Sequence, residues 1–207
     1  MDARIDLVAP GRRHGCNTWL VGDADEVIVV DPGTDAQAVL AAVADREILA
    51  VICTHGHAGH VEAALEVAAR DEAPVALHRM DMLAWREAHP GGEPEIPMEE
   101  GGIFEVADVA LEVLYTPGHS PGSVCLYCEE LAVVLSGDAL LADGPAPHAG
   151  EYPDFPGQLN AIGQELLTLP REVRVLPGHG EEITVGTAGK RFDSWAAGGP
   201  QPGDPPG

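Results

Sequence analysis

The stretch VICTHGHAGHVEAAL, residues 51–65, guides the interpretation of the whole sequence. It places His55, His57 and His60 within six residues, directly after an apolar run. The apolar run indicates a strand, and the residues that follow have the apolar spacing of a helix. The histidines are therefore expected on a loop at the carboxyl end of a strand, where α/β proteins commonly build sites. Neutral imidazole is a common zinc ligand, and imidazoles two residues apart can converge on one ion.

Three further residues of ligand type follow strand-like runs later in the chain. His119 lies in TPGHSPGS (116–123), Asp138 in LSGDAL (135–140) and His179 in LPGHGEE (176–182). In each segment an apolar run ends in a glycine-containing turn, and glycine lets the backbone turn tightly and pass close to an ion. Ligands from several strand ends are how a composite metal site is assembled, so the sequence predicts one metal centre.

The remaining periodicity predicts two successive blocks of strands and helices. We expect strands at 17–22, 26–33, 48–56, 74–78, 108–118, 122–128, 131–138 and 173–180. We expect helices at 35–47, 61–71 and 156–170, and a short one near 186–197. Two blocks of this kind favour an α+β arrangement of two sheets with helices outside. Residues 1–197 are expected to form a single domain, and the Pro/Gly-rich residues 198–207 a mobile tail.

Composition narrows the classes of partner. The formal net charge is -23 and Lys190 is the only lysine, so the surface repels phosphate backbones and anionic membranes. We therefore expect a small-molecule substrate, with no nucleic-acid or membrane partner, while the oligomeric state stays open. The first 15 residues carry charges where a signal peptide needs an apolar core, which favours the cytoplasm.

Four cysteines do not suggest a disulfide framework in a chain of 207 residues. Cys125 and Cys128 form a CxxC motif within a predicted strand, where residues three apart point to opposite faces. Two core thiols are therefore a better interpretation than a metal knuckle or a redox pair.

The series THxHxGH, TPGHSPGS, SGD and PGHG resembles the metallo-β-lactamase superfamily, nearest to its glyoxalase II-like hydrolases. The resemblance extends from NTWLV (17–21) to the last predicted strand and helix, and four ordered motifs make it specific. It implies an αββα sandwich with two mixed sheets and a site on one edge of both.

The resemblance also implies roles for the individual residues. His55, His57 and His119 would form a first metal site, and Asp138 would bridge to a second site. His60 and His179 would serve that second site. Asp31, in the VVDPG segment, would lie behind the ligands and help to orient their loops.

Gly59 departs from the family pattern, because members usually carry an aspartate there that binds the second metal and hydrogen-bonds the attacking hydroxide. Glycine supplies neither interaction. Losing a carboxylate from a dication site lowers its affinity for metal. We therefore expect one tightly bound zinc ion and a second that is weaker or absent, with iron or manganese as alternative metals.

Three functions remain open at this stage. The first is a hydrolase in which a metal-activated hydroxide attacks a thioester, ester or lactone carbonyl, with Asp138 as the catalytic carboxylate. The second is a mononuclear iron oxygenase similar to persulfide dioxygenases, using His55, His119 and Asp138. The third is a degenerate member that binds a ligand without turnover.

Residues 141–158 form a long Gly/Pro-rich segment after the strand that carries Asp138. Long ordered loops of this kind are often binding loops. Tyr152 and Phe155 are candidate substrate contacts, although packing of the loop on its own helix is an equal alternative.

Overall fold

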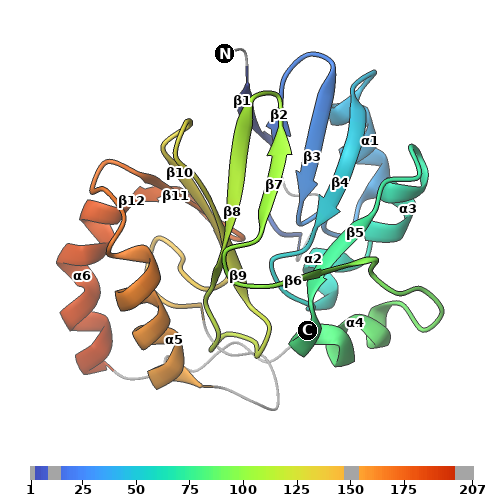
Figure 1. Ribbon diagram of the computed structural model, residues 1–207. Helices are drawn as coiled ribbons and strands as arrows, with labels where there is room; N and C mark the ends of the chain where they lie inside the picture. The colour runs from blue at the N-terminus through green and yellow to red at the C-terminus, as the bar shows by residue number, and fades with distance from the viewer. Residues whose placement is uncertain (1–2, 9–14, 147–153, 199–207) are drawn as a thin grey trace.

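Two six-stranded sheets face each other in the computed structural model of the chain, and helices cover the outer face of each (Figure 1). The structure describes residues 3–8, 15–146 and 154–198. The strand order is β1-β2-β3-β4-β5-β6 in the first sheet and β12-β11-β10-β9-β8-β7 in the second. Both sheets mix parallel and antiparallel pairs, as β3 with β4 and β2 with β3 illustrate. The αββα sandwich expected from the sequence is confirmed.

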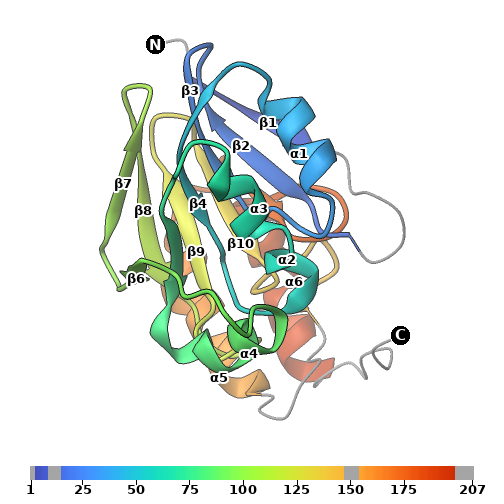
Figure 2. The ribbon, with the colours of Figure 1, turned by 90° about the vertical axis from the view of Figure 1, so that its right-hand side faces the viewer.

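The first half of the chain builds one sheet and its covering helices. The strands are β1 (Arg4–Val8), β2 (Thr18–Gly22), β3 (Glu26–Val30), β4 (Glu47–Ile52), β5 (Val75–His78) and β6 (Ile96–Met98). The helices are α1 (Ala36–Val43), α2 (Ala58–Val61), α3 (Ala64–Ala69), the 3₁₀ turn η1 (Arg79–Asp81) and α4 (Met82–Ala88). Figure 2 shows α1 and α3 lying across the outer face of this sheet.

The second half builds the other sheet. Its strands are β7 (Ile103–Val106), β8 (Val109–Tyr115), β9 (Val124–Cys128), β10 (Val133–Gly137), β11 (Arg174–Pro177) and β12 (Ile183–Thr184). Its helices are α5 (Phe155–Ala161), the π-helical turn η2 (Ile162–Leu166) and α6 (Val185–Gly198). Figure 1 places α5 and α6 on the outer side of this sheet.

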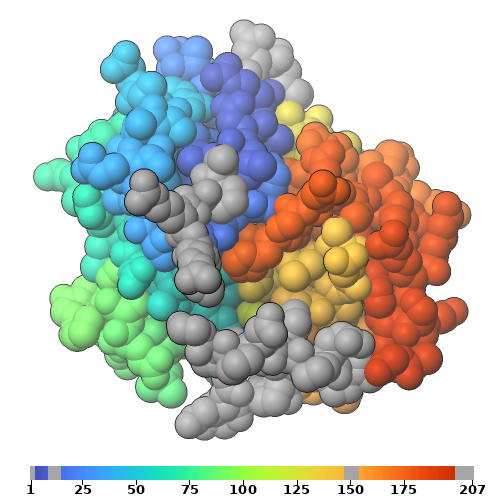
Figure 3. Space-filling model, turned by 180° about the vertical axis from the view of Figure 1, so that it is seen from behind, coloured from blue at the N-terminus to red at the C-terminus, as the bar shows by residue number. Residues whose placement is uncertain are grey.

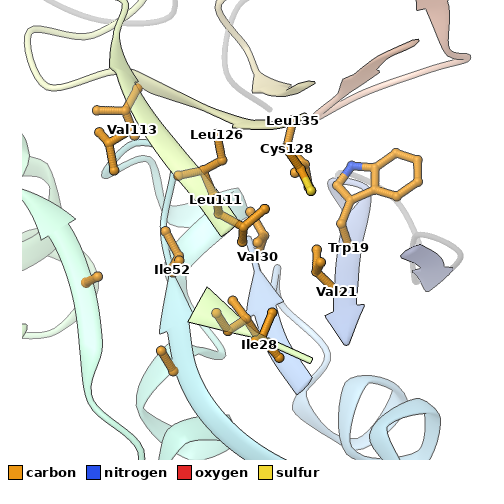
Figure 4. Close-up of a cluster of buried hydrophobic side chains, with 14 of the residues drawn as sticks. Trp19, Val21, Ile28, Val30, Ile52, Leu111, Val113, Leu126, Cys128 and Leu135 are labelled. Atoms are coloured by element: carbon orange, nitrogen blue, oxygen red, sulfur yellow. The ribbon is translucent and has the colours of Figure 1, made fainter. Parts of the chain in front are cut away.

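Alternation along the strands sends side chains into two different cores. In β3, Ile28 and Val30 point into the core between the sheets, where Leu111 and Leu126 meet them (Figure 4). Val27 and Val29 point the other way, into the core beneath α1 and α3. Each fully buried side chain of this size stabilises the fold by roughly 1.5–3 kcal/mol relative to an exposed one. The interior strands are thus buried on both faces, as their continuous apolar runs require.

The helix α1 shows why a local pattern becomes this element. Ala36, Val39 and Val43 recur at helical spacing, and all three are buried against the sheet. Asp35 precedes them as the N-cap, and its side chain accepts a hydrogen bond from the Ala38 N–H at 3.0 Å. This bond satisfies one of the N–H groups that a helix start leaves unpaired.

The two cysteines of the CxxC motif lie on opposite faces of β9, as predicted. Cys125 packs in the core beneath α5 and α6, and Cys128 packs between the sheets. All four cysteines are buried and free. The predicted disulfide-free core is therefore confirmed.

The structure also adds elements that the periodicity did not predict. These are the strands β1, β6, β7 and β12. All four lie at sheet edges, and most of their residues are exposed or half-buried. Gly198, expected in the tail, belongs to α6, and the rest of the expected tail, residues 199–207, lies outside the described residues. None of the described helices is both long and apolar enough to span a membrane.

Candidate metal centre

The loop after β4 delivers the first group of imidazoles. His55 is buried and follows the strand by three residues, while His57 is the N-cap of α2 and makes no capping bond with its side chain. His119 comes from the loop after β8, on the other sheet. The ligand-type nitrogens of these three histidines lie within 4.8 Å of one another, and His119 Nε2 is 3.1 Å from His57 Nδ1.

A second group of three side chains adjoins the first. His60 from α2 meets Asp138 after β10 and His179 after β11, again with ligand atoms within 4.8 Å. His60 Nε2 lies 3.2 Å from His179 Nε2 and 3.5 Å from Asp138 Oδ2. The same carboxylate oxygen is 3.5 Å from His119 Nε2 and therefore faces both groups. All six residues named from the sequence as ligand candidates are brought together.

Asp31 lies directly behind the histidines. Its Oδ1 accepts the Thr54 N–H and its Oδ2 accepts the Thr54 hydroxyl, both at 2.7 Å. Because that hydroxyl donates to Asp31, its free lone pair can accept from His55 Nδ1, which is 3.1 Å away. Asp31 Oδ2 also accepts from His60 Nδ1 at 3.0 Å. His55 then carries its proton on Nδ1 and presents the Nε2 lone pair to the site, while the His60 Nδ1–H bond to Asp31 turns His60 Nε2 toward Asp138 and His179.

A further grouping of ligand-type atoms joins Asp31 with His55 and His60. Both lone pairs of Asp31 Oδ2 already accept hydrogen bonds, and Oδ1 accepts the Thr54 N–H. Asp31 is therefore better suited to orienting the ligands than to binding an ion. This is the placement expected of a residue that helps to position the ligand loops.

The electrostatics of the cluster favour a cation. Burial, followed by the neighbouring His60 and His119, holds the pKa of His55 well below its usual range. Burial also lowers the pKa of His57, so both rings are neutral at pH 7, as metal ligands must be. Burial lowers the pKa of His60 too, but the Asp138 and Asp31 carboxylates on its two sides raise that pKa more.

Asp138 is ionised in this environment. Burial alone would raise the pKa of its carboxyl group, but the adjacent His60, by charge and by hydrogen bonding, holds that pKa well below its usual range. The position between Asp138 and the imidazoles is thus favourable for positive charge. A divalent metal ion bound at this position would supply that positive charge.

Unpaired buried atoms test whether these residues fit a metal. His55 Nε2 and Asp138 Oδ1 are buried, and neither has a hydrogen-bond partner among the described residues. An unpaired buried polar atom is costly unless something outside the protein chain satisfies it. Several imidazole nitrogens and one carboxylate form a donor set suited to zinc or iron. The residues fit a transition-metal ion.

Gly178 is required for the closeness of the second group. A Cβ atom at this position would lie 2.5 Å from Asp138 Oδ1 and 2.7 Å from His60 Cε1. Real contacts of this kind are longer, so any side chain would displace one of the two ligand candidates. The glycine in the PGHG motif therefore provides the space that the ligands occupy.

Gly59 lies in α2 between His57 and His60 and is half-buried. Across the described part of the chain, the groups that could hold a metal contain only two carboxylates, Asp31 and Asp138. No other carboxylate there takes the place of the one that Gly59 lacks.

The structure describes one of the two candidate substrate contacts. Tyr152 lies outside the described residues. Phe155 is half-buried at the start of α5, next to Asp154, whose N–H donates to the Gly118 carbonyl at 3.3 Å. Gly118 precedes His119, so Phe155 begins a helix that adjoins a ligand loop.

The sequence interpretation did not identify several residues that hold the ligand loops in place. Asn17 donates from Nδ2 to the Pro177 and Gly180 carbonyls, both at 3.0 Å, on either side of His179. Figure 3 shows this face, where the N-terminal strands (blue) adjoin the segment around β11 and β12 (orange). Gln158 donates to the carbonyl of Asp138 at 3.3 Å. Asn17 begins the first predicted strand, and nothing else in the sequence around it indicates that it holds a ligand loop.

The sequence profile described as the metallo-beta-lactamase superfamily matches residues 11–179, a range that contains every ligand candidate. The chain belongs to this superfamily. A protein of Aquifex aeolicus is 33% identical to this chain over 200 residues, covering 88% of this chain and 92% of the relative. A probable metallo-hydrolase of Bacillus subtilis, YqgX, is 32% identical and covers 82% of this chain and 87% of its own. The hydroxyacylglutathione hydrolase GloC of Haemophilus influenzae is 25% identical over 179 residues, which cover 79% of this chain and 84% of GloC.

Two solved structures superpose closely on this one. The B3 metallo-beta-lactamase BLEG-1 aligns with a TM-score of 0.80 and 25% identity, covering 92% of this chain and 97% of its own. TTHA1623, determined in a di-iron-bound form, aligns with a TM-score of 0.79 and 30% identity. The alignment covers 89% of this chain and 97% of TTHA1623. Their folds correspond to this one along nearly their whole length.

Proposed function

We propose that this protein is a metal-dependent hydrolase that cleaves a thioester, ester or lactone bond of a small molecule. The observation that carries the proposal is the ionised Asp138 at the junction of the two imidazole groups, with Oδ1 unpaired among the described residues. Relatives named as a probable metallo-hydrolase and a hydroxyacylglutathione hydrolase support hydrolysis, and the second name points to thioesters.

The metal ligands in this proposal are His55, His57 and His119 for a first ion, and His60, His179 and Asp138 for a second. A divalent ion supplies Lewis acidity, which polarises a carbonyl oxygen and lowers the pKa of a coordinated water toward 7. The proposed metal is zinc, bound tightly at the first group.

The second group is proposed to bind more weakly for two reasons. Gly59 has no side-chain oxygen to offer, and among the described residues Asp138 is the only carboxylate in the second group. The side chain of His179 is also 41% exposed, against 3% for His60 and His119, so fewer packing contacts hold its ring in position for an ion.

Asp138 has the proton-handling role in this proposal. Its ionised carboxylate can accept a hydrogen bond from the attacking water through Oδ1, and can then hold the proton until the leaving group takes it. A positioned general base typically contributes ~10²–10⁴-fold to the rate. His60 and His119 flank Asp138 Oδ2 and keep the carboxylate turned into the site.

The test begins with metal content and a panel of neutral substrates. The purified protein is assayed with acyl thioesters, an activated ester and a γ-lactone, before and after chelation and zinc repletion. We expect cleavage of at least one substrate, lost on chelation and restored by zinc, and lost by about 10²–10⁴-fold in Asp138→Asn. His78→Ala is the matched control, because His78 stacks on Tyr115 and belongs to none of the groups that could hold a metal. Hydrolysis that survives complete chelation contradicts the proposal.

A mononuclear or dinuclear iron enzyme is the second candidate, because a 30% identical neighbour was solved in a di-iron-bound form. His55, His119 and Asp138 would provide the two-histidine, one-carboxylate set that non-haem iron uses. Iron content that exceeds zinc content, with oxygen consumption and no hydrolysis, would favour this candidate. Metal binding without either activity would indicate a member that binds ligands without turnover.

We also propose that residues 1–197 act as one domain, in the cytoplasm, on a small molecule and without nucleic-acid or membrane partners. The charge of -23 supports the exclusion of polyanionic partners. A neutral acyl group suits such a surface better than a strongly anionic carrier.

A further inference from the structure

Asp81 is a buried carboxylate that lies outside the ligand groups and joins two ligand loops. It is 2% exposed and stands at the junction of η1 and α4. The helix α4 lies beside α2, as Figures 1 and 2 show. Its Oδ2 accepts hydrogen bonds from the Gly56 N–H at 2.8 Å and from the Ser120 hydroxyl at 2.6 Å. Its Oδ1 accepts from the Gly122 N–H at 2.6 Å.

An ordinary structural explanation does not account for these bonds. Aspartate is a preferred N-cap residue, and Asp81 is the N-cap of α4. Its side chain nevertheless makes no capping bond to that helix. Its three hydrogen-bond donors Gly56, Ser120 and Gly122 belong to the loops that carry His55, His57 and His119, 25 to 41 residues away in sequence.

The contacts with Asp81 leave no room for a side chain at the two glycines beside it. A Cβ atom on Gly56 would lie 2.7 Å from the Asp81 carbonyl oxygen, and one on Gly122 would lie 2.7 Å from the Asp81 Cγ. Only glycine lets each loop approach the carboxylate so closely. The glycines in HGH and SPGS therefore serve the contact with Asp81.

We infer that Asp81 is a positioning residue that sets the separation of His57 and His119 and thereby the affinity of the first metal site. Gly56 lies between His55 and His57, and Ser120 directly follows His119. One carboxylate thus anchors both loops at positions adjacent to their ligands. The inference rests on the proposed metal site and adds a residue to it.

The substitution Asp81→Asn tests this role, because it removes one hydrogen-bond acceptor and keeps the rest of the side chain. The amide keeps the shape of the side chain but retains only one acceptor oxygen. If the oxygen takes the Oδ2 position, the Gly122 N–H faces an NH₂ group; if it takes the Oδ1 position, the Gly56 N–H does so. The Ser120 hydroxyl can turn and accept, but a backbone N–H cannot. In either orientation one ligand loop loses its anchor.

The experiment measures zinc affinity of the chelator-stripped protein by competition with a chromogenic chelator. We expect Asp81→Asn to weaken binding of the first ion by about 10–100-fold, the usual effect of losing a group that orients metal ligands. Cobalt substitution provides a second readout, because altered ligand geometry shifts the visible absorption bands. Asp71→Asn is the matched control: Asp71 accepts the Ile48 N–H at 2.8 Å, away from the ligand loops.

Thermal unfolding distinguishes positioning from general stability. A purely structural role lowers the melting temperature of metal-free and zinc-loaded protein equally, and leaves the zinc-induced increase unchanged. A positioning role makes that increase smaller in Asp81→Asn than in wild type or Asp71→Asn, since stabilisation by a ligand follows its affinity. An unchanged increase, together with zinc affinity within twofold of wild type, would overturn the inference.

Ser120→Ala decides the question if Asp81→Asn does not fold. It removes one neutral donor and leaves both backbone bonds to Asp81, so we expect about tenfold weaker zinc binding. Zinc affinity equal to wild type in Ser120→Ala would then overturn the inference. A wild type that binds no zinc or cobalt would overturn the proposed metal site as well, whereas normal binding in wild type and in both variants would overturn only the role of Asp81.

Discussion

Replacing Gly178 by alanine would place one methyl group where two ligand candidates now meet. The new Cβ would start 2.5 Å from Asp138 Oδ1 and 2.7 Å from His60 Cε1, and ordinary contacts begin near 3.4 Å. Asp138 and His60 must therefore move apart from it by roughly 0.7–0.9 Å. A misplacement of about 1 Å can cost ~10²-fold in rate. We expect kcat/KM to fall by about 100-fold.

The effect on stability should be smaller. Inserting a methyl group into a packed region costs about 1–3 kcal/mol, which corresponds to a fall in Tm of roughly 3–10 °C for a chain of this size. The second metal should weaken more than the first, because Asp138 and His60 belong to the second group. The assays are zinc titration, thermal unfolding and hydrolysis of whichever substrate the wild type cleaves.

Gly189→Ala is the control for this substitution. Gly189 lies in α6 and a Cβ there would meet nothing within 4 Å, so the change should stabilise the helix by about 0.5–1 kcal/mol. The reasoning is refuted if Gly178→Ala keeps wild-type activity and wild-type affinity for the second ion while folding normally.

Three other substitutions or treatments probe separate parts of the structure. Gly59→Asp should raise occupancy of the second site and raise kcat on a thioester by supplying an anionic ligand, with an effect of up to ~10²-fold; higher metal content with lower activity would show that the glycine keeps space for substrate. Thr54→Val should weaken zinc binding by about 10–100-fold, because the Nδ1 of His55 loses its acceptor, and unchanged affinity would exclude the hydrogen-bond chain through Asp31. Burial raises the pKa of Cys125 to about 12 and that of Cys128 to about 11, so both stay protonated and unreactive at pH 8. An aromatic disulfide reagent should react with these thiols only after denaturation, and rapid labelling of the native protein would contradict their burial.

The ligand candidates could be predicted because they come shortly after recognisable strands, and all except His55 directly follow a glycine. A strand such as β10, VVLSG, ends where its apolar run ends, and parallel neighbours bring such ends to one edge. The positions of His119, Asp138 and His179 follow from local pattern plus this geometric rule.

The residues behind the ligands could not be predicted in the same way. Asp81 and Asn17 act through contacts with loops that are distant in sequence, and no local periodicity marks them. The edge strands escaped prediction for a different reason. β12 has two residues and β6 has three, one of them Pro97, so neither is long enough to show an alternating pattern.

The division of the ligand candidates between the two sheets has a consequence for the assembly of the molecule. His55, His57 and His60 come from the first half of the chain, whereas His119, Asp138 and His179 come from the second. Neither half alone holds either of the two proposed metal sites, His55/His57/His119 or His60/Asp138/His179, so these sites are complete only after the sheets have docked. During synthesis the ion would then bind late, after the two sheets have packed, and would link the two sheets at one edge. Two separately expressed halves, 1–101 and 102–207, should each bind zinc poorly and recover tight binding when they are mixed.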